Sequence, residues 1–132
     1  MTASLYKLIL IVDDDVNGRL IIKEFLLLHE YEVIEAYNGE QALNLLITHT
    51  PDLILSDISM PGTDGLAMIQ AIRAKWRFRY TPIITLSGYS RPEDQQAALS
   101  AGATSHLTKP INIVDLLREI KDALSAPPNT SA

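Results

Sequence analysis

Acidic side chains follow two of the most apolar segments of the chain, at the point where each segment ends. Asp13, Asp14 and Asp15 follow the segment 8–12, and Asp57 follows the segment 53–56. If the fold brings these carboxylates together, they cannot all stay ionised unaided, so either a carboxyl pKa rises or a cation neutralises the group. Magnesium fits best, because it binds one or two carboxylates, keeps several waters and takes phosphate oxygens as further ligands.

A hydroxyl group and an ammonium group follow two later apolar segments in the same way. Ser87 follows the segment 83–86, and Lys109 follows the segment 106–108. Each residue also has a simpler structural explanation, because Asp15 can cap a helix, Ser87 can form a turn and Lys109 can pair with an aspartate. The combination of carboxylates, hydroxyl and ammonium after four different segments instead predicts a site that binds a phosphoryl group.

The elements that position these residues alternate along the chain. Five short apolar segments alternate with five stretches of helical period, which is typical of an α/β protein; the segments are 8–12, 31–36, 53–56, 83–86 and 106–108. The first, third and fourth are nearly all apolar, as expected of strands buried on both faces, and the second is predicted at a sheet edge. In a doubly wound sheet the site lies beyond the carboxyl ends of the strands, at the switch point flanked by strands one and three.

The first helix, which begins at Val16, carries two apolar stripes. We predict that Ile21, Phe25 and Leu28 face the core. A second stripe, which we call the helix-one stripe, is expected on the solvent side and consists of Val16, Leu20 and Leu27. A helix of a partner protein could pack on this stripe beside the acidic site, although single exposed apolar residues are also ordinary.

The composition limits the classes of function. The chain has 132 residues, 47% of them hydrophobic, which is enough for one domain with a core. Its net charge of −5 argues against general binding to nucleic acid or anionic lipid. It has no cysteine, no apolar run long enough to span a membrane and no recognisable signal peptide, so we expect a cytoplasmic protein that does not enter the membrane.

The segments that carry the chemistry resemble the receiver domain of two-component response regulators. The resemblance covers about residues 5–125 in order and rests on segments 8–15, 57–65, 82–88 and 108–110. It implies a doubly wound, flavodoxin-like parallel sheet of five strands in the order 2-1-3-4-5, with five helices. The receiver domain is expected over residues 1–125, and residues 126–132 are expected to be a polar tail or the start of a linker.

The resemblance also implies a role for each site residue. Asp57 would accept a phosphoryl group from a histidine kinase or phosphotransfer protein, and the domain would then switch conformation. Asp14 would bind Mg²⁺ directly, Asp13 largely through water, and the backbone carbonyl of Ser59 would complete the protein ligands together with Asp57. Ser87 and Lys109 would bind the phosphoryl group, and the Lys109–Pro110 bond would be cis. Beyond weak self-phosphorylation and self-dephosphorylation, no enzymatic activity is implied.

Other expectations concern regulation and partners. His106 stands where the family usually has Tyr or Phe, so it is either the switch ring that responds to Ser87 or an ordinary strand residue. Ser59 and Tyr89 are expected beside the path of the water that attacks the phosphorus. The kinase is expected to dock on the helix-one stripe. The resemblance also leaves open a homodimer through the face formed by the fourth helix, the strand 106–108 and the last helix.

Two other functions compete with this interpretation. A phosphatase of the haloacid-dehalogenase type also uses an aspartyl nucleophile, but Asn17 stands where that family has Thr or Val. A degenerate receiver would bind proteins without phosphorylation, and the complete set of acceptor-site side chains argues against it. The segment 73–80 interleaves four cations with three aromatic residues, but we predict it at the opposite end of the sheet as a connector, without direct binding to nucleic acid.

Overall fold

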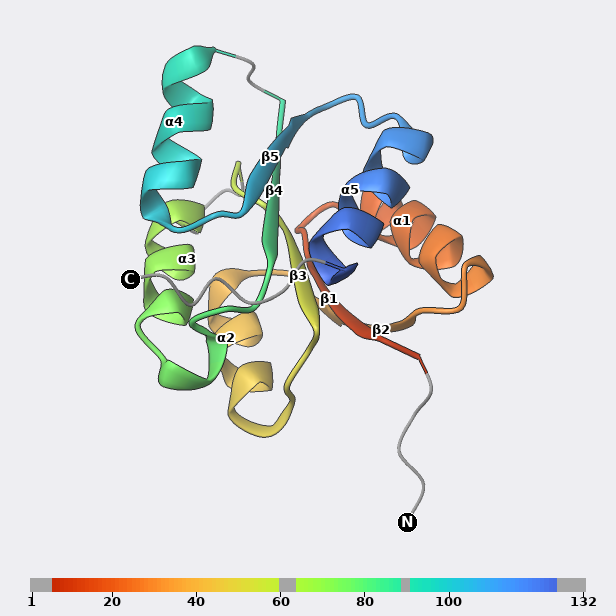
Figure 1. The fold of residues 1–132 in the computed structure, drawn as a ribbon, viewed down its shortest axis with the longest axis horizontal. Helices are drawn as coiled ribbons and strands as arrows, with labels where there is room; N and C mark the ends of the chain where they lie inside the picture. The colour runs from red at the N-terminus through yellow and green to blue at the C-terminus, as the bar shows by residue number, and fades with distance from the viewer. Residues whose placement is uncertain (1–5, 60–63, 89–90, 126–132) are drawn as a thin grey trace.

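The computed structural model describes residues 6–59, 64–88 and 91–125. Five strands alternate with five α-helices along the chain (Figure 1). The strands are β1 (Leu8–Val12), β2 (Glu32–Ala36), β3 (Leu53–Asp57), β4 (Ile83–Ser87) and β5 (Ser105–Thr108). The helices are α1 (Val16–Leu28), α2 (Gly39–Thr48), α3 (Gly65–Arg73), α4 (Pro92–Ala101) and α5 (Ile113–Ser125), and a short 3₁₀ helix, η1 (Trp76–Phe78), precedes β4.

All four strand pairings are parallel, and the sheet has the order β2-β1-β3-β4-β5. The predicted doubly wound, flavodoxin-like fold with five helices is therefore confirmed, as is the position of β2 at an edge. After β1 the chain first adds β2 on one side and then crosses to β3 on the other. Because the direction of winding reverses there, the carboxyl ends of β1 and β3 flank the crevice where ligands bind in this architecture.

The helices cover the two faces of the sheet unequally (Figure 1). One apolar cluster joins one face of the strands to α2, α3, η1 and α4, and the other joins the opposite face to α1 and α5. The central strands β1, β3 and β4 are almost completely buried, because helices cover them on both sides. No helix within the described ranges is long and apolar enough to cross a membrane.

Side chains at the helix ends explain several boundaries. The Asn38 side chain accepts a hydrogen bond from the backbone N–H of Gln41 at the start of α2, and Asn112 accepts bonds from the first turn of α5. Gly102 ends α4 with a φ of 123°, a backbone conformation that residues other than glycine rarely adopt. Arg91 occupies the N-cap position of α4 without a side-chain capping bond, and Pro92 is the first residue of the helix.

The predicted core face of α1 is wrong. Ile21 and Leu28 are 61% and 80% exposed, whereas Ile22 and Leu26 are buried and Phe25 is partly buried against the same cluster. The sequence contains apolar residues on several sides of this helix, so the amphipathic pattern does not select one face. The packing of α1 against the sheet makes the selection, and in the observed orientation Arg19 and Lys23 pair with Glu35 of β2.

Candidate functional site

The first acidic residues of the site follow β1. Asp13 is 2% exposed, and its carboxylate accepts a hydrogen bond from the backbone N–H of Asp15 at 2.9 Å. Asp14 is exposed, and Asp15 occupies the N-cap position of α1 without a side-chain capping bond. Asp15 thus occupies the predicted N-cap position, but the side chain that holds the turn between β1 and α1 is that of Asp13.

Asp57 is the last residue of β3 and is 5% exposed. One carboxylate oxygen accepts a hydrogen bond from the backbone N–H of Ser59 at 2.8 Å, and the other lies 2.7 Å from Lys109 Nζ. Both oxygens are therefore held by groups that favour negative charge. Carboxylate oxygens of Asp13, Asp14 and Asp57 lie within 4.8 Å of one another, so the structure brings the three predicted carboxylates together.

Lys109 joins this acidic group from the loop after β5. Its ammonium group lies 2.7 Å from the Asp57 carboxylate and 3.6 Å from that of Asp13. The backbone N–H of Lys109 donates to the carbonyl of Ser87, and the Lys109–Pro110 peptide bond is cis, as predicted. One cation thus faces two largely buried carboxylates at the carboxyl edge of the sheet.

Burial and neighbouring charges shift two pKa values in the site. Burial raises the pKa of the Asp13 carboxyl above its ordinary value, and the Asp57 and Asp14 carboxylates add to this rise, against the Asp15 N–H bond and the charge of Lys109. Burial by itself lowers the pKa of Lys109, but the hydrogen bond to Asp57 and the charges of both carboxylates outweigh it, so the pKa is raised. Asp13 therefore binds a proton more readily than an ordinary aspartate, and Lys109 stays protonated.

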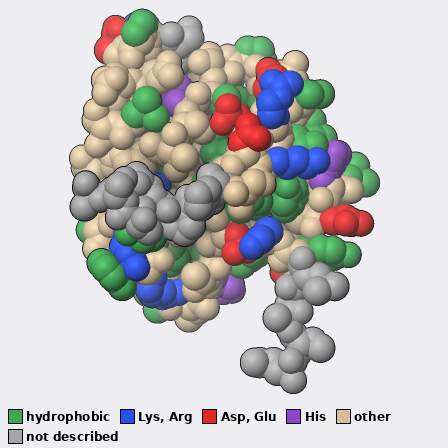
Figure 2. Space-filling model, in the orientation of Figure 1, with side chains coloured by type: hydrophobic (Ala, Val, Ile, Leu, Met, Phe, Trp, Pro, Cys, Tyr) green, Lys and Arg blue, Asp and Glu red, His purple; other side chains and the backbone are tan. Residues whose placement is uncertain are grey.

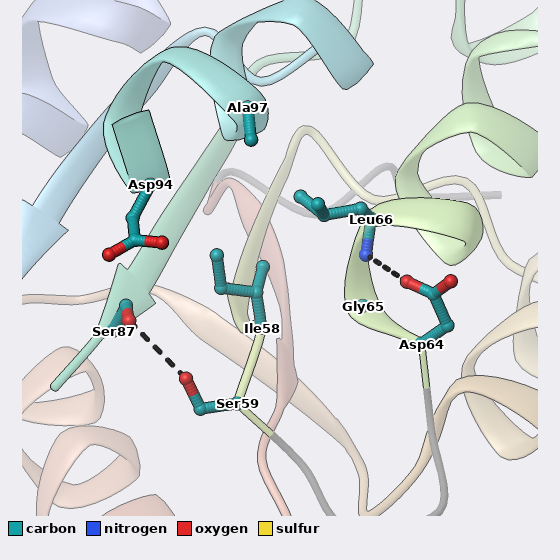
Figure 3. Close-up of a pocket in the computed structure, with 8 residues that line it drawn as sticks. All are labelled: Ile58, Ser59, Asp64, Gly65, Leu66, Ser87, Asp94 and Ala97. Atoms are coloured by element: carbon teal, nitrogen blue, oxygen red, sulfur yellow. Dashed lines mark hydrogen bonds between the residues drawn. The ribbon is translucent and has the colours of Figure 1, made fainter. Parts of the chain in front are cut away.

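Ser87 and Ser59 bring hydroxyl groups from β4 and from the loop after β3. Their Oγ atoms lie 3.3 Å apart at one end of a pocket of about 230 Å³, where Figure 3 shows them joined by a dashed line. The pocket continues between the N-terminal ends of α3 and α4, where Asp94 points toward Ser87. The second residue predicted to lie on the path of the attacking water, Tyr89, lies outside the described residues.

Gly65 is a structural requirement of the site that the sequence analysis did not predict. A Cβ atom at this position would lie 2.6 Å from the Cα atom of Ile58, so only glycine lets α3 approach the loop after β3 this closely. Asp64 begins the same helix by accepting hydrogen bonds from the N–H groups of Leu66 and Ala67. In the sequence, the Asp64-Gly65 pair was the signal that could have indicated this helix start and its close approach to the loop after β3.

An ion network behind the acidic group was also not predicted. Arg19 of α1 donates to the backbone carbonyl of Asp13 at 2.6 Å and pairs with Glu35 of β2 at 3.1 Å, and Lys23 pairs with the same carboxylate at 2.9 Å. The pKa of Glu35 is lowered, mainly by the Lys23 hydrogen bond and also by that from Arg19, against burial. The network ties the turn after β1 to α1 and β2. The four-residue spacing of Arg19 and Lys23 was its only signal in the sequence.

His106 lies on β5 directly opposite Thr85 of β4. Its Nδ1 atom lies 2.7 Å from the hydroxyl oxygen of Thr85, which also donates to the carbonyl of Ser105. The ring is therefore half-buried and hydrogen-bonded to the neighbouring strand. The role of Thr85 as the partner of His106 was not predicted from the sequence. It could not be, because the pairing depends on the register of β4 and β5.

The remaining predicted features are not part of the acidic group itself. Val16, Leu20 and Leu27 are exposed, so the helix-one stripe faces solvent as predicted. The 73–80 segment contains η1 and connects the C-terminal end of α3 to the amino end of β4. It therefore lies at the end of the sheet opposite Asp57, as predicted.

Comparison with known proteins gives the family. Residues 9–121 match the response regulator receiver domain. The chain is 36% identical over 118 residues to the response regulator GtcR of Aneurinibacillus migulanus, covering 89% of this chain and 48% of that protein. It therefore spans about half of that relative's length.

Solved structures agree with this assignment. The chemotaxis response regulator CheY4 of Vibrio cholerae superimposes with a TM-score of 0.84 at 32% identity, covering 89% of this chain and 98% of that one. The receiver domain of a sensor histidine kinase from Pseudomonas aeruginosa, which has a magnesium ion coordinated in its active-site cleft, gives 0.85 at 29% identity over 92% of this chain and 99% of that one. The chain belongs to the response regulator receiver domain family, and its function is that of a signalling domain of two-component systems.

Proposed function

We propose that Asp57 is the phosphoacceptor of this receiver domain. The observation that carries the proposal is the placement of its carboxylate, which lies at the end of a buried strand between Lys109 Nζ and the Ser59 N–H. A carboxylate oxygen attacks the phosphorus of a phosphohistidine, the P–N bond breaks and an acyl phosphate forms on Asp57. Phosphoryl transfer needs positioning and charge stabilisation more than further covalent chemistry, and these neighbours supply both.

The residues around Asp57 would bind the transferred group. Lys109, already 2.7 Å from the acceptor carboxylate, would offset charge on the phosphoryl oxygens. Ser87 would donate its hydroxyl from the end of β4, and Ser59 lies beside the route that a hydrolytic water would take. Slow attack by water on the same phosphorus would return the carboxylate, so we infer weak self-dephosphorylation as well as self-phosphorylation from small acyl phosphates.

The acidic group fits a magnesium ion. Three carboxylates within 4.8 Å of one another match the hard oxygen ligands that Mg²⁺ prefers. Burial, and after it the charges of Asp57 and Asp14, raises the pKa of Asp13, so a cation at this position would favour its ionised form. Asp13, Asp14 and Asp57 would hold the ion together with the backbone carbonyl of Ser59. When bound, it neutralises charge on the phosphoryl oxygens. The Pseudomonas aeruginosa receiver domain with its coordinated magnesium supports this proposal.

The same family assignment suggests the partners. We infer that a histidine kinase or phosphotransfer protein donates the phosphoryl group and docks on the helix-one stripe, because this stripe is exposed and begins three residues after Asp13.

We propose His106 as the switch ring, whose movement would have to break the bond to Thr85. A homodimer through α4, β5 and α5 and a cytoplasmic location also remain proposals. The exposed Val114 supports the homodimer.

The experiment is phosphorylation with acetyl phosphate and Mg²⁺, followed by intact mass measurement. Wild-type protein should gain an adduct of about 80 Da, the mass of one phosphoryl group. The adduct should be absent from Asp57→Asn and from wild-type protein treated with a chelator, and it should persist in the control Asp122→Asn on the exposed side of α5. An adduct that survives in Asp57→Asn would show that another residue is the acceptor.

A further inference from the structure

The segment between α3 and β4 carries cations and aromatic rings that the phosphoryl site does not use. Figure 2 shows Lys and Arg side chains beside hydrophobic ones at the lower left, at this end of the molecule. Trp76 is 75% exposed and Tyr80 is 44% exposed. We call Lys75, Trp76, Arg79 and Tyr80 the amino-end platform, because they lie at the amino ends of the strands.

The platform is built on a fixed base. Phe78, in the middle of the segment, is fully buried in the core cluster of α2 and α3. Arg73 donates to the carbonyls of Phe78 and Thr81, and Arg77 donates to the carbonyls of Leu46 and Ile47 at the end of α2. These two cations are therefore engaged in holding the segment in place.

Arg79 and Lys75 are left for another partner. The Arg79 guanidinium lies 3.4 Å from the centroid of the Trp76 ring and 4.7 Å from that of Tyr80. It donates one hydrogen bond to the carbonyl of Trp76, and its Nε atom is buried without a hydrogen-bond partner in the part of the chain that the structure describes. Ion pairs among the described residues involve neither Lys75 nor Arg79.

The chain segments around the platform contain few acidic residues. The chain has 16 acidic residues, but none between Asp64 and Glu93, and none in the segments 41–51 and 95–114. Those segments include the ends of α2, α3 and α4 nearest the platform. Asp52, which follows α2, accepts a hydrogen bond from the backbone N–H of Leu8. The platform is a local excess of positive charge on a protein of net charge −5.

We propose that the amino-end platform binds an acidic segment of a partner protein. Trp, Tyr and Arg are the residues most enriched among those that dominate the energy of protein interfaces. Here they are preorganised by stacking, so little side-chain entropy is lost on binding. Carboxylates of the partner would pair with Arg79 and Lys75, and an apolar residue between them would cover the open side of the Trp76 ring.

Charge favours a peptide over nucleic acid as the occupant. Only two of the described cations in the segment 73–80 remain available, so few phosphates could be neutralised there, and binding to a polyanion would be weak at physiological salt. The remaining surface of the protein is acidic and would repel a long phosphate backbone. An acidic peptide needs only a short stretch of contact and tolerates this surrounding charge.

The test uses Trp76 as its own reporter, because it is the single tryptophan of the chain. The full chain is titrated with a peptide in which glutamates flank leucines, and in parallel with the same peptide carrying glutamine for each glutamate. We expect a saturable change in Trp76 emission with the glutamate peptide, weakened by added salt, and little change with the glutamine peptide. Equal binding of both peptides, or no saturable change with either, would overturn the proposal.

Matched variants then locate the binding. Arg79→Gln and, separately, Lys75→Gln should weaken binding, by roughly tenfold for Arg79→Gln. The control Lys121→Gln removes an exposed cation from α5, on the other face of the sheet, and should leave it unchanged. Equal weakening in Arg79→Gln and Lys121→Gln would contradict the proposal, because it would indicate attraction by net charge alone.

Two further outcomes would reassign the platform. Saturation by a short single-stranded oligonucleotide in preference to the glutamate peptide would identify nucleic acid as the ligand. Self-association that Arg79→Gln abolishes would identify a second copy of this chain. Phosphorylation by acetyl phosphate should be the same in Arg79→Gln and in the wild type, so the result is independent of the role of Asp57.

Discussion

Replacement of Asp13 by asparagine should stabilise the protein in the absence of divalent cations. The Asp13 carboxylate is 2% exposed, so its charge is removed from water when the chain folds. At an effective dielectric constant of about 20, unit charges 3.6 Å apart, the distance to Lys109 Nζ, attract by about 4.6 kcal/mol. Two carboxylates 4.8 Å apart repel by about 3.5 kcal/mol, and the Asp57 carboxylate lies within that distance.

The attraction by Lys109 is therefore largely cancelled by repulsion from Asp57, and Asp14 adds to the repulsion. What remains is the cost of burial, which agrees with the raised pKa of Asp13. Asparagine has nearly the same shape and can still accept the hydrogen bond from the Asp15 N–H. We expect Asp13→Asn to increase the free energy of unfolding by about 1 kcal/mol at neutral pH, which is within the ordinary range for a single substitution.

The pH dependence has a defined sign. Because the pKa of Asp13 is higher in the folded state than in the unfolded chain, the folded state binds the proton more tightly. The penalty from this carboxylate is thus fully present above its folded pKa and is relieved as the pH falls through that value. The stability difference between Asp13→Asn and the wild type should therefore be largest at neutral pH and shrink in acid.

Urea unfolding with a chelator, and again with Mg²⁺, is the assay. A ligand at about 100 times its Kd stabilises the folded state by about 2.7 kcal/mol, so saturating Mg²⁺ should stabilise the wild type more than the variant and reverse their order. Asp122→Asn, an exposed change on α5, should shift stability by less than about 0.5 kcal/mol under both conditions. A loss of stability in Asp13→Asn at neutral pH with chelator would refute the reasoning, because attraction by Lys109 would then dominate.

Three further predictions test the placement of other residues. Leu20→Ala should reduce phosphotransfer from the cognate kinase by roughly tenfold while leaving phosphorylation by acetyl phosphate unchanged; equal loss with both donors would indicate damage to the site or fold, and no loss with either would exclude docking on the stripe. Trp76 emission should barely change with Mg²⁺ or beryllofluoride, because η1 lies at the far end of the sheet, and strong quenching at saturating Mg²⁺ would contradict that placement. His106→Tyr should still be phosphorylated but should alter the amide NMR shifts that beryllofluoride induces in α4 and β5, and an unaltered pattern would exclude a switching role.

The strands and the acidic site could be predicted because each follows from a local signal. Short apolar segments that end in polar residues predicted all five strands, and each predicted strand end lies within one residue of the observed end. Since parallel strands present their carboxyl ends at one edge, Asp13, Asp57 and Lys109 had to come near one another once the order of strands was known. The distances could not be predicted, because they depend on how far each loop turns back toward the crevice.

Features that depend on packing between elements were beyond the sequence pattern. The face of α1 was misassigned because Ile21, Ile22 and Leu26 are equally apolar, and the choice among them is made by the crossing of α1 over the sheet. The same crossing directs Arg19 toward Glu35 and the Asp13 carbonyl. The Thr85–His106 bond depends on the register of β4 and β5, which local sequence does not determine.

The two ends of the sheet separate phosphoryl chemistry from the proposed peptide site. A five-residue strand spans about 16 Å, so the platform and the Asp57 carboxylate lie roughly that far apart or further. Electrostatic effects between exposed charges are largely screened beyond about 8 Å at physiological ionic strength. A partner on the platform would therefore neither cover Asp57 nor change its charge environment directly. Any coupling between the two would have to pass through β4, whose carboxyl end carries Ser87 and whose amino end follows η1. Without such coupling, the receiver could keep one partner bound to the platform while another delivers the phosphoryl group to Asp57.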